Sequence, residues 1–246
     1  MAVFVQTDCR LWLDGHDYSG KSNALAVTYG AEMQDDTVYG DDTRSRAGGL
    51  KTVLAEAEGF VDYSPDATNI DEVVFGRVGT ADTIMTFAPT GTEGDKAFGF
   101  EANIGTYEVG GVLGELAPFS LSAEGSGGVD GLVEGTILAN GTKTTTADGT
   151  GFQVGAVSAS QFVYAHMHVF SVSASDTLDV VIESDATDAW SGAETTRFTF
   201  SQATASNTVQ WASRVAGAIT DPWWRATWTI GGSDTSMQFA VVLGIK

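Results

Sequence analysis

The amino-acid sequence predicts an all-β fold with a single helix. Thirty glycines stand against four prolines, and such a composition, with abundant Thr and Val, favours short strands joined by tight turns. Apolar side chains recur at every second position along most of the chain, which is the period of a strand with one buried face. One segment alone has convincing helical spacing. At 246 residues, the chain can form one large β-domain or two small ones, each with a substantial core.

The N-terminal part contains a short strand and then two long ones. Residues Leu11 to Leu13 read as a short strand, followed by a tight Asp14-Gly15 turn. Apolar residues alternate from Leu25 to Met33, and a second alternating strand runs from Thr52 to Phe60. These two strands are predicted to form the sides of a long hairpin.

A charged segment separates the two long strands, and a turn is predicted within it at Gly48-Gly49. So long a connection inside a compact β-domain is uncommon, and its length indicates either a functional arm or a disordered loop. A solvated, mobile hairpin is the alternative to a functional arm. The charged residues of this segment are Asp35, Asp36, Asp41, Asp42, Arg44 and Arg46.

The single helix is predicted next. Ile70, Val73, Val74 and Arg77 are spaced as one face of a helix, with acidic residues in the first turns and Gly79 just beyond the end. A lone helix in a strand-rich chain is expected to cover one open edge or end of a sandwich. Further strands are predicted at 83–87, 98–104, 118–123 and 133–139, with a turn at Ser126-Gly127-Gly128.

A change of composition then divides the chain. Residues Asn140 to Gly151 lack any large apolar side chain, which indicates a linker or wide loop. Alternation resumes from Phe162 to Ile245 in about six short strands, as in a jelly-roll or immunoglobulin-like β-sandwich. We therefore predict two domains, 1–140 and 150–246.

The charge distribution is strongly acidic and uneven. The net charge is −20, which disfavours direct binding to nucleic acid through phosphate neutralisation. Residues 1–140 carry −16 of it and residues 141–246 carry −4. No run approaches the roughly eighteen apolar residues of a membrane span, and the N-terminus resembles no signal peptide. We expect the protein to stay in the cytosol or to assemble there, and to insert into no membrane.

Catalytic and metal-binding patterns are weak. His166 and His168 would share one face of a strand, but they lack a matched third ligand and lie among aromatic residues, which favours a structural role. The paired aspartates lack the alternating spacing of a calcium loop, and Cys9 reads as an inert, half-buried thiol. No phosphate-binding glycine loop or nucleophile elbow is present. We predict no enzyme activity, no catalytic residue, no metal site and no cofactor.

A tryptophan cluster near residue 224 allows a second interpretation. Alternation places Trp224 and Trp228 in the core, while Trp190 and Trp223 are the candidates for an exposed, sugar-binding platform.

Several segments in order resemble the major tail protein, or tail tube protein, of long-tailed bacteriophages. The first is the run Leu13-Asp14-Gly15-His16-Asp17-Tyr18-Ser19. The second is Gly40-Asp41-Asp42-Thr43-Arg44-Ser45-Arg46, followed by Gly49-Leu50-Lys51. The helix and the later segment 111–119 keep the family's order of elements. The resemblance covers roughly the first 130 residues, and the segment 224–244 is similar, more weakly, to an extra sandwich of some phage tail proteins.

The resemblance implies a tail-tube-type β-sandwich or barrel with one helix, followed by an outward C-terminal sandwich. Such subunits form rings, usually of six copies, that stack into a tube through which DNA passes without specific binding. The resemblance also implies that the long arm reaches an adjacent subunit or ring, and the residues assigned to that contact are Asp35, Asp36, Asp41, Asp42, Arg44 and Arg46. Further partners implied are the tail terminator, tape measure and baseplate. The implied location is the virion, after assembly in the host cytoplasm. An acidic lumen would repel DNA phosphates.

Two other classes of function remain open. A capsid decoration or tail-completion protein would share the sandwich fold and acidic surface. A carbohydrate-binding or receptor-binding module would use Trp190 and Trp223. A second tube domain at 150–246 would instead halve the number of subunits in a ring.

Overall fold

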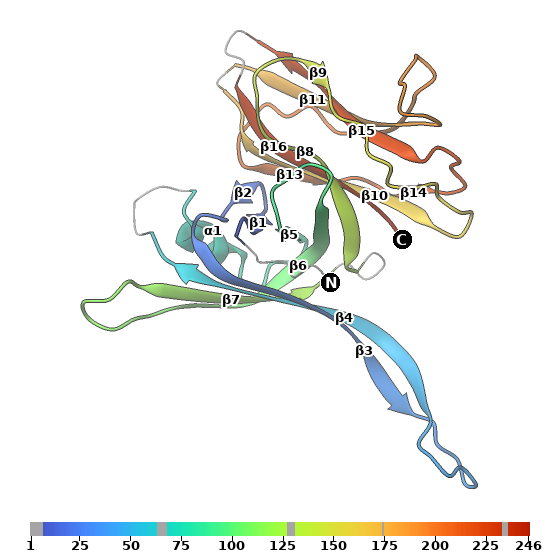
Figure 1. Ribbon diagram of the computed structural model, residues 1–246. Coiled ribbons are helices and arrows are strands. Elements are labelled where there is room, and N and C mark those ends of the chain that lie inside the picture. Colours follow the sequence, from blue (N-terminus) through green and yellow to red (C-terminus); the bar gives the residue numbers. More distant parts are fainter. Residues whose placement is uncertain (1–6, 63–67, 127–130, 174, 233–235) are drawn as a thin grey trace. The chain divides into compact units, whose positions relative to one another are not determined.

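The computed structural model describes residues 7–62, 68–126, 131–173, 175–232 and 236–246 (Figure 1). Within them the chain forms sixteen strands and one α-helix, which confirms the predicted all-β class. The chain divides into two compact units, each built from discontinuous segments. The first comprises Met1–Gly20, Ile84–Gly99 and Val133–Lys246, and the second comprises Lys21–Thr83 and Phe100–Leu132.

The first unit contains a sandwich of two antiparallel layers. One layer is the part β13-β10-β16-β8 of a larger sheet, in which β8 also pairs with residues 96–99, and the other is a separate four-stranded sheet with the order β12-β11-β15-β9. Their bounds are β8 Val133–Lys143, β9 Ala147–Asp148, β10 Phe162–Ser171, β11 Thr177–Asp185, β12 Thr195–Thr199, β13 Thr208–Trp211, β15 Trp223–Gly231 and β16 Met237–Ile245, with β14 Val215–Ala216 beside β10.

The core between the two sheets comes from alternate positions, as the strand period requires. Met167 on β10, Ile182 on β11, Trp224 on β15 and Phe239 on β16 are all fully buried in it. Trp228 is also buried there, which confirms that Trp224 and Trp228 belong to the core.

The other face of β10 and β16 is buried as well. Trp12, Phe170 and Val242 pack there in a second, smaller cluster. Trp12 comes from β1 (Arg10–Leu13), which pairs with β2 (His16–Asp17) and with β5 (Thr83–Ala88). A strand covered on both faces reads as a nearly continuous apolar run, which explains the burial of eight successive residues of β10.

The predicted histidine pair lies on this second face. The Gly15 N–H donates to His168 Nδ1 (3.3 Å), so that His168 carries its proton on Nε2 and donates it to Thr86 Oγ1 (2.9 Å). The Thr86 hydroxyl then donates to His166 Nε2 (2.8 Å). A Cβ at Gly99 would lie 2.3 Å from His166, so glycine leaves the room for this ring. The chain of bonds requires both imidazoles to be neutral, which supports the predicted structural role.

Burial perturbs both histidines in the same direction. It lowers the pKa of His166 to about 3. Burial, followed by the positive charge that His166 and His16 would carry, lowers the pKa of His168 well below its ordinary value.

The second unit contains a four-stranded antiparallel part of a larger sheet and one helix. The strand order within it is β3-β4-β7-β6, where β3 is Ser22–Asp35, β4 Arg46–Phe60, β7 Pro118–Gly125 and β6 Lys96–Val109 from residue 100 onward. Alternate residues such as Ala55, Phe119 and Ile104 are buried on one face.

The helix α1 spans Ile70–Arg77, as its apolar spacing predicts. Ile70 and Val74 are buried, Asp71 and Glu72 lie in the first turn and Arg77 lies in the last, an arrangement that suits the helix dipole. The Gly79 N–H donates to the carbonyl of Ile104 (2.9 Å), which ties the end of the helix to β6. No helix in the described part of the chain is long and apolar enough to cross a membrane.

Two local predictions were wrong. Gly48-Gly49 is no turn but lies inside β4, where the register with β3 shifts between Ala31 and Met33. Glycine suits such a β-bulge, and a Cβ at Gly49 would lie 3.0 Å from the Glu32 carbonyl oxygen. The predicted linker 140–151 contains the end of β8 and all of β9, because its small polar residues occupy sheet edges rather than a core.

The compact units have other boundaries than the predicted domains 1–140 and 150–246. Strand β8 pairs with β16, and β9 with β15, so the sandwich includes residues that precede 150. The separate folding of those two ranges stays a prediction. The predicted turn at 126–128 extends beyond the described residues.

We expect the protein to lose stability as the pH falls from 7 to 5. The unfolded chain takes up protons at His166 and His168 near the ordinary pKa of about 6.5, whereas the folded chain keeps both neutral, so the unfolded state binds more protons and is favoured. Each histidine contributes a slope of about 1.4 kcal/mol per pH unit once the pH lies well below that value. Urea unfolding across this range measures the slope.

The control for this prediction is the double variant His166→Gln, His168→Gln. Its free energy of unfolding should vary much less between pH 7 and 5, whatever its absolute value. An unchanged slope in the double variant would contradict the assignment to these two rings.

Candidate assembly interface

The predicted arm is a two-stranded ribbon that projects from the second unit (Figure 1). Strands β3 and β4 pair from Ser22 opposite Gly59 to Asp35 opposite Arg46. The next strand, β7, covers β4 only from Leu54 to Phe60. Residues 46–53 therefore have β3 as their sole neighbouring strand in the described chain, and at about 3.3 Å per residue the ribbon extends about 26 Å past the sheet. A two-stranded ribbon is marginally stable in water by itself, so the arm is suited to a partner surface.

The loop at the end of the arm is held by its own polar groups. The Thr37 hydroxyl and its backbone N–H both donate to Asp35 Oδ1 (2.6 and 3.1 Å). These bonds lower the pKa of Asp35. The Ser45 N–H donates to Thr37 Oγ1 (3.0 Å) and the Val38 N–H to Asp41 Oδ2 (3.0 Å). The loop is thus a defined turn that presents its remaining side chains outward.

All six charged residues predicted for the arm are exposed on this structure. Asp35 and Arg46 end the paired strands, and the other four lie in the loop between them. Their contact with another subunit stays a prediction.

The apolar residues at the arm's end were not singled out from the sequence. Val38 is 67 % exposed and Tyr39 is fully exposed. Met33 and Leu50, farther back along the ribbon, are exposed as well. The sequence offered one signal for them. Val38 and Tyr39 are two adjacent large apolar residues in a loop of aspartates and glycine, and such a loop is otherwise expected to be polar.

The outward face of the four-stranded sheet is acidic. Cross-strand rows run from Ala24 through Glu58 and Ser120 to Glu108, and from Ala26 through Glu56 and Ser122 to Thr106. The Thr106 and Ser122 hydroxyls are 2.7 Å apart. The charged residues that alternation places on this face are Glu56, Glu58, Glu101, Glu108 and Glu124.

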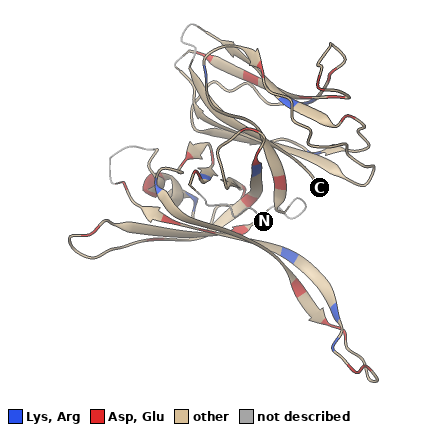
Figure 2. Ribbon diagram, viewed as in Figure 1, with Lys and Arg blue, Asp and Glu red and all other residues tan. Residues whose placement is uncertain are grey.

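No Lys or Arg takes an outward position in the described four-stranded part of this sheet. Figure 2 shows red segments along β4 and β7, whereas the blue segments of β4 lie within the arm. Small neutral residues separate the carboxylates. This face, which we call the acidic face, repels polyanions and offers them no cationic contact.

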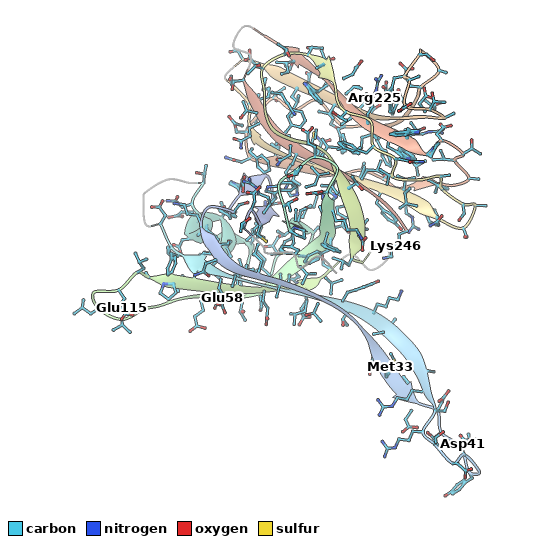
Figure 3. All side chains as sticks on the ribbon, viewed as in Figure 1. Met33, Asp41, Glu58, Glu115, Arg225 and Lys246 are labelled. Carbon is cyan, nitrogen blue, oxygen red and sulfur yellow. The ribbon has the colours of Figure 1, made fainter. Side chains whose placement is uncertain are left out.

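The end of the sheet opposite the arm carries a second exposed apolar loop. It joins β6 to β7 through residues 110–117, and Val112, Leu113 and Leu116 in it are 67 %, 103 % and 70 % exposed. A hollow of about 390 Å³ lies beside its base and is lined by Glu58, Glu108 and Phe119, among others. In Figure 3, Asp41 and Glu115 mark the two ends, with Glu58 between them.

The predicted ligand platform is only half-exposed. Trp190 and Trp223 are both partly buried. The Arg225 guanidinium lies 4.3 Å from the centroid of the Trp190 ring, and Glu183 holds the same guanidinium at 2.9 Å. One face of Trp190 is therefore occupied by its own chain, which weakens the case for sugar stacking. Binding of a ligand by these two residues stays a prediction.

No cluster of three or more His, Cys, Asp or Glu side chains suited to a metal ion occurs among the described residues. Cys9 is half-buried, and burial raises its pKa.

Comparison with known proteins finds similarity at the level of solved structures. No protein-family model and no curated protein sequence matches the chain. A protein in the virion of a native gene transfer agent particle matches with 14 % identity and a TM-score of 0.36, over 44 % of this chain and 81 % of that one. A protein in the tail of an empty gene transfer agent particle with C6 symmetry matches with 15 % identity and a TM-score of 0.35, over 44 % and 78 %.

A third similar structure is the SPP1 Dit (gp 19.1) protein, described as a paradigm of the hub adsorption apparatus in phages that infect Gram-positive bacteria. It has 13 % identity and a TM-score of 0.40, over 98 % of this chain and 100 % of that one. The three similar structures thus come from virion or tail particles and a phage adsorption hub. Their low TM-scores leave the function of this chain to be argued from its own residues.

We expect substitutions at the arm's end to leave the stability of the subunit unchanged. Tyr39→Ser should alter the free energy of unfolding by less than about 0.5 kcal/mol, because the side chain is fully exposed. Ile70→Ala on the helix should cost about 2–5 kcal/mol, because Ile70 is buried. Denaturant unfolding of dilute, monomeric protein measures both. A large loss for Tyr39→Ser would show that the tyrosine serves the subunit's own fold.

Proposed function

We propose that this protein is a structural component of a bacteriophage tail, whose copies form rings that stack into a tube for DNA passage. The observation that carries the proposal is the arm, which extends past its own sheet without a second neighbouring strand among the described residues. The same sheet bears the acidic face. An assembly that covers the arm and turns the acidic face inward satisfies both features. The mechanism is geometric and electrostatic, without catalysis.

The edge strand β3 supports ring formation. It is 14 residues long and pairs with β4 alone among the described strands. A long, free edge is a template for pairing with another chain, and a closed ring of sheets removes such edges. We propose closure by edge-to-edge pairing between copies, in rings of six as the family resemblance implies.

The acidic face supports the assignment of the tube's inner surface. Carboxylates at Glu56 and Glu124, spaced by serines and alanines, keep DNA from adhering to the wall. The tail terminator, tape measure and baseplate are the proposed further partners, the virion is the proposed location, and assembly takes place in the host cytoplasm.

Negative-stain electron microscopy at increasing protein concentration tests the proposal. Hollow tubes of uniform width are the expected result. Closed rings that never stack would instead favour a hub, tail-completion or capsid decoration protein. A protein that stays monomeric at every concentration and binds a glycan through Trp190 or Trp223 would favour the carbohydrate-binding or receptor-binding alternative.

Removal of the arm should separate folding from assembly. A variant in which an Asn-Gly turn replaces Asp35–Gly48 is expected to keep a cooperative unfolding transition, because the deleted side chains are exposed, yet to form no tubes. Electron microscopy and denaturant unfolding of the same preparation provide the two readouts. Normal tubes from this variant would exclude the arm from assembly.

Charge reversal on the acidic face should make the tube retain DNA. The double variant Glu56→Lys, Glu124→Lys is expected to assemble and to trap about tenfold more short duplex DNA than the unsubstituted protein at low salt, with the difference vanishing at high salt. Co-sedimentation of tubes formed in the presence of the DNA measures it. The matched control is Glu72→Lys on α1, an exposed carboxylate outside this face, and equal retention by both variants would contradict an inner position for the acidic face.

A further inference from the structure

The larger sheet curls so that its two end strands approach each other. Its strands follow the order β13-β10-β16-β8-β6-β5-β1-β2, and both ends belong to the first unit (Figure 1). A Cβ at Gly15, in the turn before β2, would lie 2.5 Å from the backbone N of Thr208, the first residue of β13. Among the described strands, however, no ladder joins β2 to β13 or to β10. We call the line where the two ends meet the seam.

The buried histidines lie at this seam. The Gly15 N–H reaches across it and donates to His168 Nδ1 (3.3 Å). Thr86 of β5 joins His168 to His166 through its hydroxyl. The ring of Trp211, on β13, stacks on the His166 ring with 4.9 Å between the centroids. A network of side chains therefore connects the two sides of the seam, where the backbone forms no ladder.

Each hydrogen bond of this network depends on where the protons lie. The Gly15 N–H needs the lone pair of His168 Nδ1, and the Thr86 hydroxyl needs the lone pair of His166 Nε2. A proton added to His168 would set two donors, the Gly15 N–H and the new Nδ1–H, against each other. A proton added to His166 would take from the Thr86 hydroxyl its acceptor. Protonation of either ring therefore breaks a bond, and at His168 that bond is the one across the seam.

The charged groups around the seam do not favour such a proton. Strands β5, β13 and β16 carry no titratable side chain. Besides the two rings, the titratable residues of β1, β2, the turn between them, β10 and residues 96–99 are Arg10, Asp14, His16, Asp17, Lys96 and Tyr164. Arg10 is paired with Asp8 and Lys96 with Glu134. Burial, followed by the positive charge that His166 and His16 would carry, lowers the pKa of His168 well below its ordinary value. The closed seam thus excludes the proton, whereas an open seam would hydrate the ring and admit it.

We propose that this network is a pH-sensitive latch: neutral His168 holds the turn before β2 against β10 and β13, and proton uptake opens the seam while the sandwich core stays closed. Opening is local because the two faces of β10 belong to separate clusters. Trp12 packs on the seam side, whereas Ile182 and Trp224 belong to the sandwich core. Strand β2 spans only two residues and pairs with β1, so its release disturbs little else. The latch acts within one subunit, does not require the proposed tube, and opens before the subunit unfolds globally.

Hydrogen–deuterium exchange of the full chain at low concentration tests the latch at pH 7 and pH 5. Each rate is corrected for the intrinsic pH dependence of amide exchange. Peptides that cover residues 10–18 report on the seam, and peptides that cover residues 223–231 report on the sandwich core. The opening equilibrium of the seam should rise at least about 25-fold from pH 7 to 5, which is the value for one histidine that is neutral when closed and has its ordinary pKa of about 6.5 when open. The core peptides should keep their protection.

Equal loss of protection in both sets of peptides would show global unfolding alone and overturn the latch, as would unchanged protection of the seam. The double variant His166→Gln, His168→Asn replaces both rings by amides that do not titrate. Its seam should open to the same extent at both pH values, whatever its absolute protection. The matched control is His16→Gln, which changes the half-buried histidine of β2 and should keep the pH dependence. Persistence of the pH dependence in the double variant, or its loss in the control, would contradict the assignment to the buried pair.

Discussion

The structure depends above all on the burial of both faces of strands β10 and β16. One face closes the sandwich with β11 and β15, and the other receives Trp12 and its neighbours. Because both faces must be covered, segments distant in the sequence are drawn into one compact unit. The two histidines that share this interior need hydrogen-bond partners within it, and the chain of bonds from Gly15 through His168 and Thr86 to His166 supplies them.

The sheet of the second unit, in contrast, is covered on one face only. Its inner face is apolar, but its outer face is left bare, acidic and, in the described four-stranded part, without cations. The strand at its edge and the ribbon beyond it have hydrogen-bonding groups and apolar side chains that the described chain does not cover. Such features are costly in an isolated domain, where they promote association, and become favourable in an ordered polymer.

The two units therefore differ in how much of their apolar and hydrogen-bonding surface the chain itself covers. The first buries its apolar core between its own sheets and against Trp12. The second leaves its edge strand, the arm and the loop 110–117 uncovered by the described chain, so burial of these surfaces by another copy would supply free energy of association. The proposed tube would bury these surfaces without requiring new structure in the subunit, and in that proposal the acidic face forms a wall to which DNA does not adhere.

The sequence by itself determined the local elements. Period-two alternation located the long strands and the core positions Trp224 and Trp228, and the spacing of Ile70, Val74 and Arg77 located the helix, because those signals depend only on near neighbours. The tertiary structure decided what near neighbours cannot encode. Gly48-Gly49 forms a bulge because β3 lies beside it, Asn140–Lys143 extends a strand because β16 pairs with it, and Glu56 and Glu124 share a face because β7 lies next to β4. Pairing between strands distant in the sequence sets the register and decides which side chains become neighbours. The candidate interface depends on both.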